Sequence, residues 1–145
     1  MKVTILEKNT GEEDELILKC DSLDENLTRL VNQFKGGKGK MNFYKGGKIV
    51  FVEAADVLYF ESVDDNVFAY TKDSVYETKS TLYQLENELP AATFFRANKA
   101  VIVNLDKIDS LAPVFGGRFE AILENGYKVV ISRNYLNTLK ELLGL

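Results

Sequence analysis

The sequence predicts a mainly β domain of the α+β class with two or three short helices. Three observations support this prediction. Short stretches rich in β-branched and aromatic residues recur from residue 41 onward, separated by turn residues at short intervals. An Asn125-Gly126 pair lies between two further stretches of this kind. Three segments begin with a helix-capping residue and then carry apolar residues at helical spacing.

Residues 1–40 predict a small strand-strand-helix extension. Residues 1–8 (MKVTILEK) and 15–20 (ELILKC) have strand character and would pair as a hairpin around an acidic turn. Ser22 and Glu25 fit a capping box that begins a helix over residues 24–35. The apolar stripe of that helix would consist of Leu27, Leu30, Val31 and Phe34.

The glycine-lysine segment GGKGK, residues 36–40, ends this helical pattern. Closely spaced glycines can bring backbone N–H groups to a phosphate. A phosphate-binding P-loop, however, needs Ser or Thr after its lysine and a position between strand and helix, whereas Met41 follows Lys40 here. We therefore interpret the segment as a linker, which divides the chain into an extension (1–40) and a main body (41–145).

The main body begins with five predicted strands, at residues 41–44, 48–53, 57–62, 67–71 and 75–79. Their short connections are typical of an antiparallel meander. A short helix follows, because Thr81 and Gln84 fit a capping box and Pro90 prevents continuation. Its apolar side would consist of Leu82, Leu85 and Leu89.

The C-terminal part predicts a buried strand, a hairpin and a final helix. The apolar run Ala100–Val103 has polar residues directly ahead of it. Asn125-Gly126 predicts a hairpin over residues 118–131 with a type I′ turn. Ser132 would cap the last helix. The apolar stripe of that helix would be Tyr135, Leu136, Leu139, Leu142 and Leu143.

The composition argues against an enzyme. The 145 residues contain no histidine, which removes the commonest general base and the commonest zinc ligand. We therefore expect no catalytic residues, no metal and no cofactor. The single cysteine, Cys20, cannot form an intramolecular disulfide, and its apolar surroundings suggest a buried thiol. There is neither a long apolar run nor a signal peptide, which predicts a cytoplasmic protein without membrane insertion.

Three segments place polar groups at expected strand ends, where a core does not need them: residues 62–66, 96–99 and 132–134. Asn and Arg have the geometry to bind base edges in pairs of hydrogen bonds, and Lys binds phosphate as a point charge. A purely structural interpretation is also open, with a turn at 64–66, an ion pair at Arg96 and a helix cap at Ser132. The net charge of −4 requires any cationic site to be local.

The ordered series IVFV, ADVLYFES, TLYQLENELP, FFRANKAVIVNLDKI and NGYKVVISRNYL resembles the LytTR-type DNA-binding domain of bacterial transcription regulators. The resemblance runs from about Lys48 to Leu143. It implies an elongated stack of antiparallel β-sheets whose strand-end loops enter successive major grooves of double-stranded DNA. It also implies two promoter repeats and a homodimer at least on DNA.

The resemblance assigns DNA contacts to each polar segment: Asp65 and Asn66 in the first; Arg96, Asn98 and Lys99 in the second; Arg133 and Asn134 in the third. Two features depart from the family pattern. Asn98 stands where a histidine is common. The acidic pair Asp64-Asp65 would repel phosphate and can assist only as an acceptor from cytosine or by orienting the duplex.

Two further interpretations of the whole chain remain at this point. The scaffold could serve as a protein-interaction module, such as an antagonist or co-regulator, with little or no DNA binding. A hydrolase has little support because Ser132 has no histidine to activate it. The extension is too short for a phospho-acceptor receiver domain, so the resemblance is to a stand-alone form. The predicted helix of the extension, residues 24–35, would pack on the rest of the chain or pair subunits.

Overall fold

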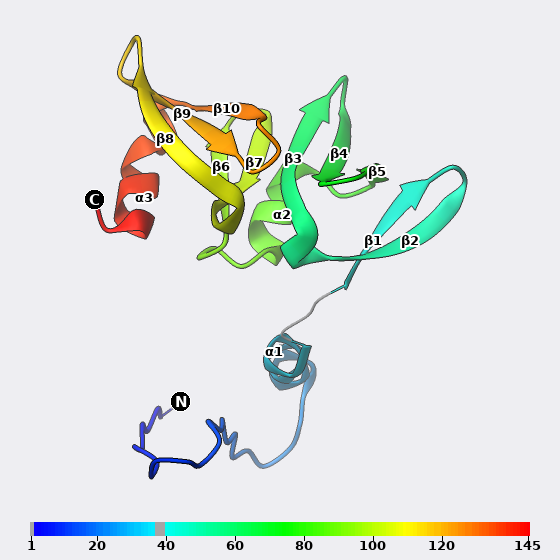
Figure 1. Ribbon diagram of the computed structural model, residues 1–145. Helices are drawn as coiled ribbons and strands as arrows, with labels where there is room; N and C mark the ends of the chain where they lie inside the picture. Colours follow the sequence, from blue (N-terminus) through cyan, green and yellow to red (C-terminus); the bar gives the residue numbers. More distant parts are fainter. Residues whose placement is uncertain (1, 37–39) are drawn as a thin grey trace. The chain divides into compact units, whose positions relative to one another are not determined.

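The computed structural model describes residues 2–36 and 40–145 and divides into two compact units, Met1–Gly36 and Gly37–Leu145 (Figure 1). The linker predicted at 36–40 falls mostly on residues 37–39, which lie outside the described residues, as does the side chain of Phe34.

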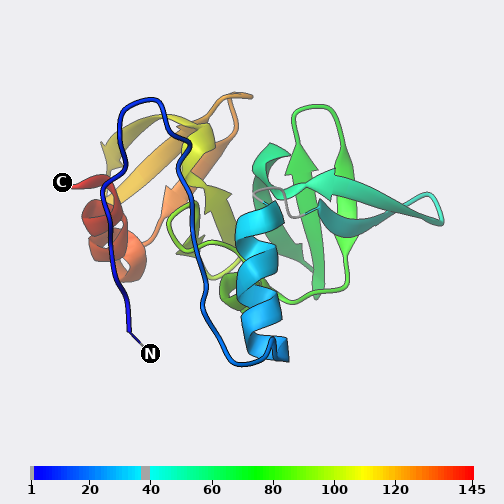
Figure 2. The same cartoon turned by 90° about the horizontal axis from the view of Figure 1, so that it is seen from below.

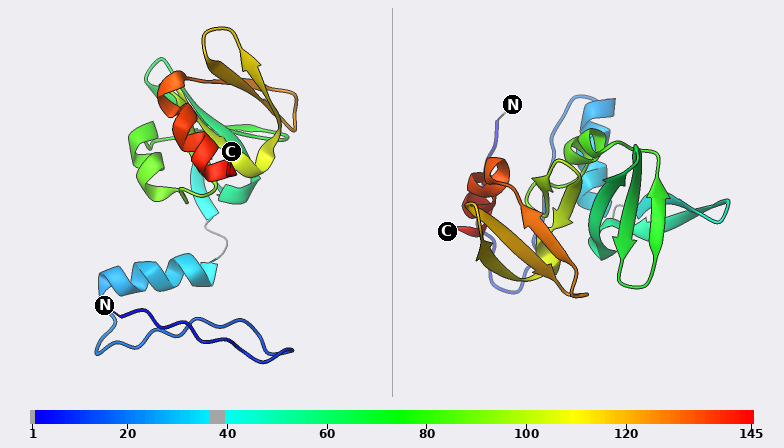
Figure 3. Two further views of the ribbon diagram at one scale, coloured as in Figure 1. Left: turned by 90° about the vertical axis from the view of Figure 1, so that its left-hand side faces the viewer. Right: turned by 90° about the horizontal axis from the view of Figure 1, so that it is seen from above.

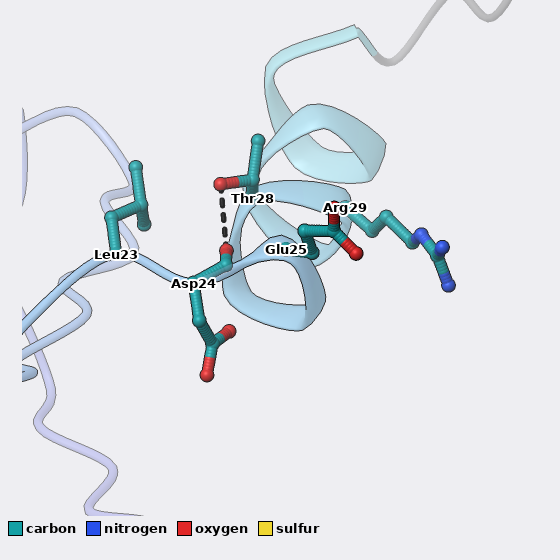
Figure 4. A pocket seen from close by; sticks show the side chains of 5 residues that line it. All are labelled: Leu23, Asp24, Glu25, Thr28 and Arg29. Atoms are coloured by element: carbon teal, nitrogen blue, oxygen red, sulfur yellow. Dashed lines mark hydrogen bonds between the residues drawn. The ribbon is translucent and has the colours of Figure 1, made fainter.

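The N-terminal unit contains one helix, α1 (Glu25–Gly36). Asp24 precedes its first residue, and the Asp24 carboxylate accepts a hydrogen bond from the Leu27 backbone N–H at 2.8 Å. Thr28 donates both its N–H and its hydroxyl to the Asp24 carbonyl, as Figure 4 shows for the hydroxyl. The predicted helix is confirmed, but the predicted cap is wrong. Asp24 occupies the N-cap position because it stands three residues before a free helical N–H.

The two predicted N-terminal strands are wrong. Residues 2–8 and 15–20 form no strand, and their apolar side chains Val3, Ile5, Leu16 and Ile17 are exposed. A lone two-stranded hairpin is marginal in water unless a third strand or a helix covers its apolar face. Cys20 is likewise exposed rather than buried, because the strand expected to enclose it does not form.

The C-terminal unit contains two antiparallel sheets (Figure 1). The larger sheet has the order β2-β1-β5-β4-β3-β7-β6 and the smaller one β10-β9-β8. The strands of the larger sheet are β1 (Lys40–Lys45), β2 (Lys48–Glu53), β3 (Val57–Val63), β4 (Asn66–Thr71), β5 (Val75–Thr78), β6 (Phe94–Asn98) and β7 (Val101–Asn104). Those of the smaller sheet are β8 (Ile108–Val114), β9 (Arg118–Leu123) and β10 (Lys128–Ile131).

The strands predicted between residues 41 and 79 are all confirmed. Two strands, β6 and β8, were not predicted from the sequence. Strand β6 pairs with β7, so the polar residues at the mouth of the Ala100–Val103 run belong to a tight β-hairpin turn. Short 3₁₀ turns at Ala54–Asp56 and Leu105–Lys107 precede β3 and β8.

Two hydrophobic clusters hold the unit together, on opposite faces of β3. One joins the larger sheet to the smaller sheet and to α3 (Arg133–Leu143), and includes Tyr59, Val103, Ile131 and Leu139. The other joins the larger sheet to α2 (Leu82–Glu88), and includes Phe43, Phe60 and Leu85. Strand β3 is therefore buried on both faces over Val57–Phe60, which explains its continuous apolar run.

Helix α2 begins as predicted. The Thr81 hydroxyl accepts from the Gln84 N–H at 3.1 Å, and the Gln84 side chain accepts from the Thr81 N–H at 2.9 Å. This reciprocal capping box satisfies two backbone donors at the helix start. Leu82, Leu85 and Leu89 are buried, as their spacing predicted.

Helix α3 follows β10 directly and packs beside the smaller sheet (Figure 2). Ser132 occupies the N-cap position as predicted, but its side chain makes no capping hydrogen bond. Leu139 is buried, and Tyr135 and Leu136 are half-buried in the same cluster. Leu142 and Leu143 are exposed, so the predicted apolar stripe is buried only in its first two turns.

The 118–131 hairpin is confirmed, but its predicted type I′ turn is wrong. That turn type needs positive φ at both central residues, and in this turn only Gly126 has it (φ 84°). The Gly126 N–H donates to the Leu123 carbonyl at 2.8 Å and the Leu123 N–H to the Tyr127 carbonyl at 2.9 Å. These bonds define a three-residue connection with Gly126 in the left-handed region, so Asn125 keeps an ordinary backbone conformation.

Candidate nucleic-acid interface

The first polar segment forms the tip of the β3–β4 hairpin. Asp64 and Asp65 have positive φ, 51° and 64°, between the paired residues Val63 and Asn66. This is the type I′ geometry, which Asp tolerates better than most residues because its short side chain bonds locally. Asp64, Asp65 and Asn66 are all exposed, and the Asn66 amide donates to the Asp64 carbonyl at 3.2 Å. The tip therefore presents two carboxylates to solvent.

The second polar segment is the β6–β7 turn, and Asn98 fixes its shape. The Asn98 Oδ1 accepts from the Ala100 N–H at 2.9 Å, which closes the turn. The Asn98 Nδ2 donates to the Val130 carbonyl at 2.8 Å, which ties the turn to β10 in the other sheet. Both ends of this amide are thus engaged inside the protein.

Arg96 also stabilises the β6–β7 turn. Its side chain is only 18 % exposed, and its Nη1 lies 3.1 Å from the Glu86 carboxylate on α2. Its Nε donates to the Asn98 carbonyl at 2.8 Å, and its Nη2 donates to the Lys99 carbonyl at 2.6 Å. All three guanidinium nitrogens therefore have partners within the unit. The side chain of Lys99 lies exposed at the tip that this bracing holds.

The third polar segment joins β10 to α3. The Ser132 N–H donates to the Ala97 carbonyl at 2.9 Å, so the start of α3 is bonded to β6 next to the second segment. Arg133 and Asn134, the first two residues of α3, are exposed. The stem of Arg133 lies beside the β8–β9 turn, where a Cβ on Gly117 would be 3.4 Å from the Arg133 Cδ.

The first two segments share one hollow in the surface. It is lined from the β3–β4 side by Ser62, Asp65 and Asn66, and from the β6–β7 side by Arg96 and Lys99. The third segment is joined to the second by the hydrogen bonds at Ala97 and Asn98. The structure therefore brings the three predicted segments together, and it places Lys99, Arg133, Asn134, Asp65 and Asn66 at the surface.

The sequence reasoning missed a third part of the lining of this hollow, the connection from β5 to α2. The lining includes Thr78, Lys79, Ser80 and Thr81. Lys79 is thus a second lysine in the lining, with its ammonium 4.7 Å from the centroid of the Tyr44 ring, while Glu77 and Asp65 add negative charge to the same lining. The signal was present in the sequence, because KST is also a polar run at a strand end. It was interpreted only as a helix start.

A stack of three tyrosines joins the two sheets beside this region. The Tyr59 ring is sandwiched between Tyr70 on β4 and Tyr127 from the β9–β10 turn, at centroid distances of 4.3 and 4.4 Å. The Tyr127 hydroxyl donates to the Glu61 carboxylate at 3.0 Å. Burial raises the pKa of all three hydroxyls, and the negative charge of Glu61 raises each of them further. The stack therefore holds neutral tyrosines between the sheets.

Residues 2–36 and 40–145 contain no group of three or more Asp, Glu or Cys side chains arranged to hold a metal ion. The helices of these residues include none that is long and apolar enough to cross a membrane.

The sequence pattern of the LytTr DNA-binding domain family matches residues 47–144 of this chain. Among curated proteins, the sensory transduction protein LytT of Bacillus subtilis is 29% identical over 125 residues, which cover 86% of this chain and 52% of LytT. The corresponding protein of Bacillus anthracis is 38% identical over 95 residues, or 39% of its length. The chain thus spans about half the length of these relatives or less.

A relative of similar length also occurs. An HTH-type transcriptional regulator of Staphylococcus aureus is 26% identical over 147 residues, covering 100% of this chain and 99% of the relative. Among solved structures, the LytTr DNA-binding domain of a methyl-accepting/DNA response regulator from Bacillus cereus superposes with a TM-score of 0.71. It is 26% identical in sequence, and the match covers 75% of this chain and 100% of that domain. The two sheets, the order of motifs and the family match agree, and the chain belongs to the LytTr DNA-binding domain family.

Proposed function

We propose that this protein is a sequence-specific regulator of transcription that reads the major grooves of double-stranded DNA through its strand-end segments. One observation carries the proposal above the others. Three polar segments, far apart in the sequence, are gathered in one region. The first two line one hollow, and hydrogen bonds from Asn98 to Val130 and from Ser132 to Ala97 join the second to β10 and to the start of α3. A rigid scaffold that positions a few exposed polar groups suits recognition of a fixed target.

The proposed roles differ among the seven predicted contact residues. Lys99 binds phosphate or a guanine edge from the second segment, and Arg133 and Asn134 read base edges from the start of α3. Asp65 and Asn66 approach the duplex from the β3–β4 tip, where a carboxylate can accept only from a cytosine amino group. For Arg96 and Asn98 we favour a positioning role, because their hydrogen-bonding groups are engaged within the protein.

The proposal also includes the organisation of the chain. Residues 41–145 form the DNA-binding domain, and residues 1–40 form an extension whose helix is available to pair subunits. A homodimer on two promoter repeats follows from the resemblance described above. A regulator of this kind acts where the chromosome is, in the cytoplasm.

The first test is selection of bound fragments from a random DNA pool at a stated salt concentration. Lys99→Ala should weaken binding to all fragments. It should also reduce the slope of log affinity against log salt by roughly 0.9, the value for one lost phosphate contact. Arg133→Ala should instead lose preference at one base pair, at a cost of about 1–3 kcal/mol. Both expectations follow from the different geometry of ammonium and guanidinium groups.

Lys72→Ala is the matched control, because Lys72 is also exposed and lies in the β4–β5 turn at the other end of β4. It should leave affinity and salt slope unchanged. If Lys99→Ala and Arg133→Ala behave like Lys72→Ala on a selected fragment, the proposed contacts are wrong.

A protein-interaction module is the second candidate. One observation favours it: Ile49 and Phe51 are exposed on β2, an edge strand of the larger sheet. Edge strands with exposed apolar residues are sites at which another chain can add. Under this alternative the random pool yields no enriched motif, while a purified partner protein binds and Phe51→Asp abolishes that binding.

A further inference from the structure

The β8–β9 turn presents an aromatic side chain to solvent. Phe115, Gly116 and Gly117 connect the paired residues Val114 and Arg118, and the Phe115 side chain is 94 % exposed. Gly116 and Gly117 have φ values of 87° and 72°, which L side chains rarely adopt. The turn therefore has a defined shape at its two glycines and holds Phe115 away from both hydrophobic clusters.

Two arginines lie against this turn. The Arg118 Nε donates to the Phe115 carbonyl at 3.3 Å, and a Cβ on Gly116 would lie 3.5 Å from the same nitrogen. The Arg133 stem packs at Gly117, where a Cβ would be 3.4 Å from the Arg133 Cδ. An exposed aromatic ring with two adjacent guanidinium side chains is complementary to a polyanion that also offers apolar surface, which describes a nucleic-acid groove.

The turn is continuous with the proposed DNA surface through Arg133. The β8–β9 and β3–β4 turns also project to the same side of the C-terminal unit, at the top of Figure 1 and of the left view in Figure 3. Major and minor grooves alternate along one face of a duplex. A segment just outside a major-groove contact therefore faces the phosphate backbone and the adjoining minor groove.

We infer that the β8–β9 turn, residues 115–118, is a further DNA-binding segment that contacts the minor groove flanking the sequence read by Arg133. Arg118 binds backbone phosphate, and the Phe115 ring packs against sugars and base edges in the groove. Apolar side chains and arginines are used in this way by proteins that bind the minor groove. This inference rests on the proposed function, since it extends the same DNA interface.

The chain contains no tryptophan, so Phe115→Trp introduces a single fluorophore at the tip. A fragment selected by the wild-type protein, with its flanking base pairs retained, should shift or quench the emission of this variant. The same fragment with that flank removed should not. Phe115→Ala should weaken binding to the long fragment by about tenfold, the size typical of one lost aromatic contact with a base. Arg118→Gln should lower the salt slope by about one.

Phe51 provides the matched control, because its ring is 64 % exposed on β2 at the far edge of the larger sheet. Phe51→Ala should bind as the wild type does, and Phe51→Trp emission should not respond to the fragment. Circular dichroism checks that each variant folds.

The outcomes distinguish a failure of the proposed DNA-binding function from a failure of the inference about residues 115–118. If the wild-type protein selects no DNA, the proposed function fails. If it does, but Phe115→Ala and Arg118→Gln bind like the wild type and Phe115→Trp is silent, only the inference is overturned. It is also overturned if Phe115→Trp responds to purified RNA polymerase and not to DNA, because the turn then contacts protein.

Discussion

Asn98 connects the β6–β7 turn to the smaller sheet through both ends of its side-chain amide. Its acceptor closes the β6–β7 turn at Ala100, and its donor reaches Val130 in the other sheet. The turn that carries Lys99 is thereby fixed to the strand that leads into α3. A displacement of either element would break a hydrogen bond, so the two segments are held as one surface.

Asn98→Ala should therefore lower both stability and DNA affinity. The substitution leaves the Val130 carbonyl and the Ala100 N–H without this partner, which costs about 1–3 kcal/mol when such groups are shielded from water. Because Lys99 loses its fixed position, affinity for a selected fragment should fall as well. Urea unfolding and fragment titration measure the two effects.

Asn137→Ala is the control for Asn98→Ala, since Asn137 is exposed on α3. It should change stability by only a few tenths of a kcal/mol, roughly the range of surface substitutions. Equal stability of the two variants would show that the amide of Asn98 does not join the sheets in solution.

Sequence reasoning at this scale identified residue types but not their partners. It placed Arg96, Asn98 and Lys99 in one polar segment ahead of a strand, and the resemblance assigned DNA contacts to all three. Only the structure separates them, since the partners of Arg96 and Asn98 include Glu86 on α2 and Val130 on β10. Such partners are distant in sequence, and no local pattern specifies them. Lys79 was missed for a different reason, because the polar run KST at a strand end was interpreted only as a helix start.

At the scale of elements, alternating apolar patterns and capping residues were sufficient to predict a strand or helix wherever that element packs against other elements. Strands β1 to β5 and helices α2 and α3 follow their predicted ranges closely. The failures involve tertiary context. Strand β6 was missed because Arg96 interrupts its apolar pattern, and residues 2–20 failed as strands because nothing in their unit covers them.

Tertiary context also decided the types of two hairpin turns. The preferred Asn-Gly pair did not form a type I′ turn, whereas the less favoured Asp64-Asp65 pair did. Strand register sets the number of residues in each connection, and only two remain between Val63 and Asn66. Because a two-residue hairpin connection requires the I′ or II′ geometry, register here overrides residue preference.

The tyrosine stack predicts that the junction between the sheets weakens at alkaline pH. The folded-state pKa values of Tyr59, Tyr70 and Tyr127 are raised above the unfolded value of about 10. A group whose pKa is higher in the folded state contributes its full stabilisation at pH values below its unfolded-state pKa. This stabilisation is lost as pH rises from the unfolded-state pKa through the folded-state pKa. The free energy of unfolding should therefore begin to fall at about pH 10 and continue to fall as pH rises further. Urea unfolding at increasing pH measures this loss.

Tyr127→Phe tests the cause, because it keeps the ring in the stack and removes the hydroxyl that donates to Glu61. It should cost about 0.5–1.5 kcal/mol at neutral pH and reduce the alkaline loss. Tyr83→Phe is the control, since Tyr83 is exposed on α2. An alkaline loss as large in Tyr127→Phe as in the wild type would exclude Tyr127 from the effect.

For the molecule as a whole, a net charge of −4 restricts how it can hold DNA. Cationic side chains at the proposed interface are few: Lys79, Lys99, Arg118 and Arg133. Each phosphate neutralised contributes roughly 0.9 to the salt slope, so the dependence on salt should be modest. Under the proposed function, specificity would then depend on hydrogen bonds from fixed positions, which is consistent with the internal hydrogen bonds of Arg96 and Asn98.

The division of the chain leads to a final prediction about residues 1–39. Every residue of the two described hydrophobic clusters lies between Met41 and Leu139. A chain of residues 40–145 should therefore fold with a thermal unfolding midpoint close to that of the full chain, and it should bind a single repeat with similar affinity.

If α1 pairs subunits, the shortened chain should lose cooperative binding to two repeats, because each domain then binds alone. Analytical ultracentrifugation on fragments with one and two repeats measures this. Unchanged cooperativity would assign subunit contacts to the 40–145 domain itself, and a shortened chain that fails to fold would show that residues 1–39 belong to its core.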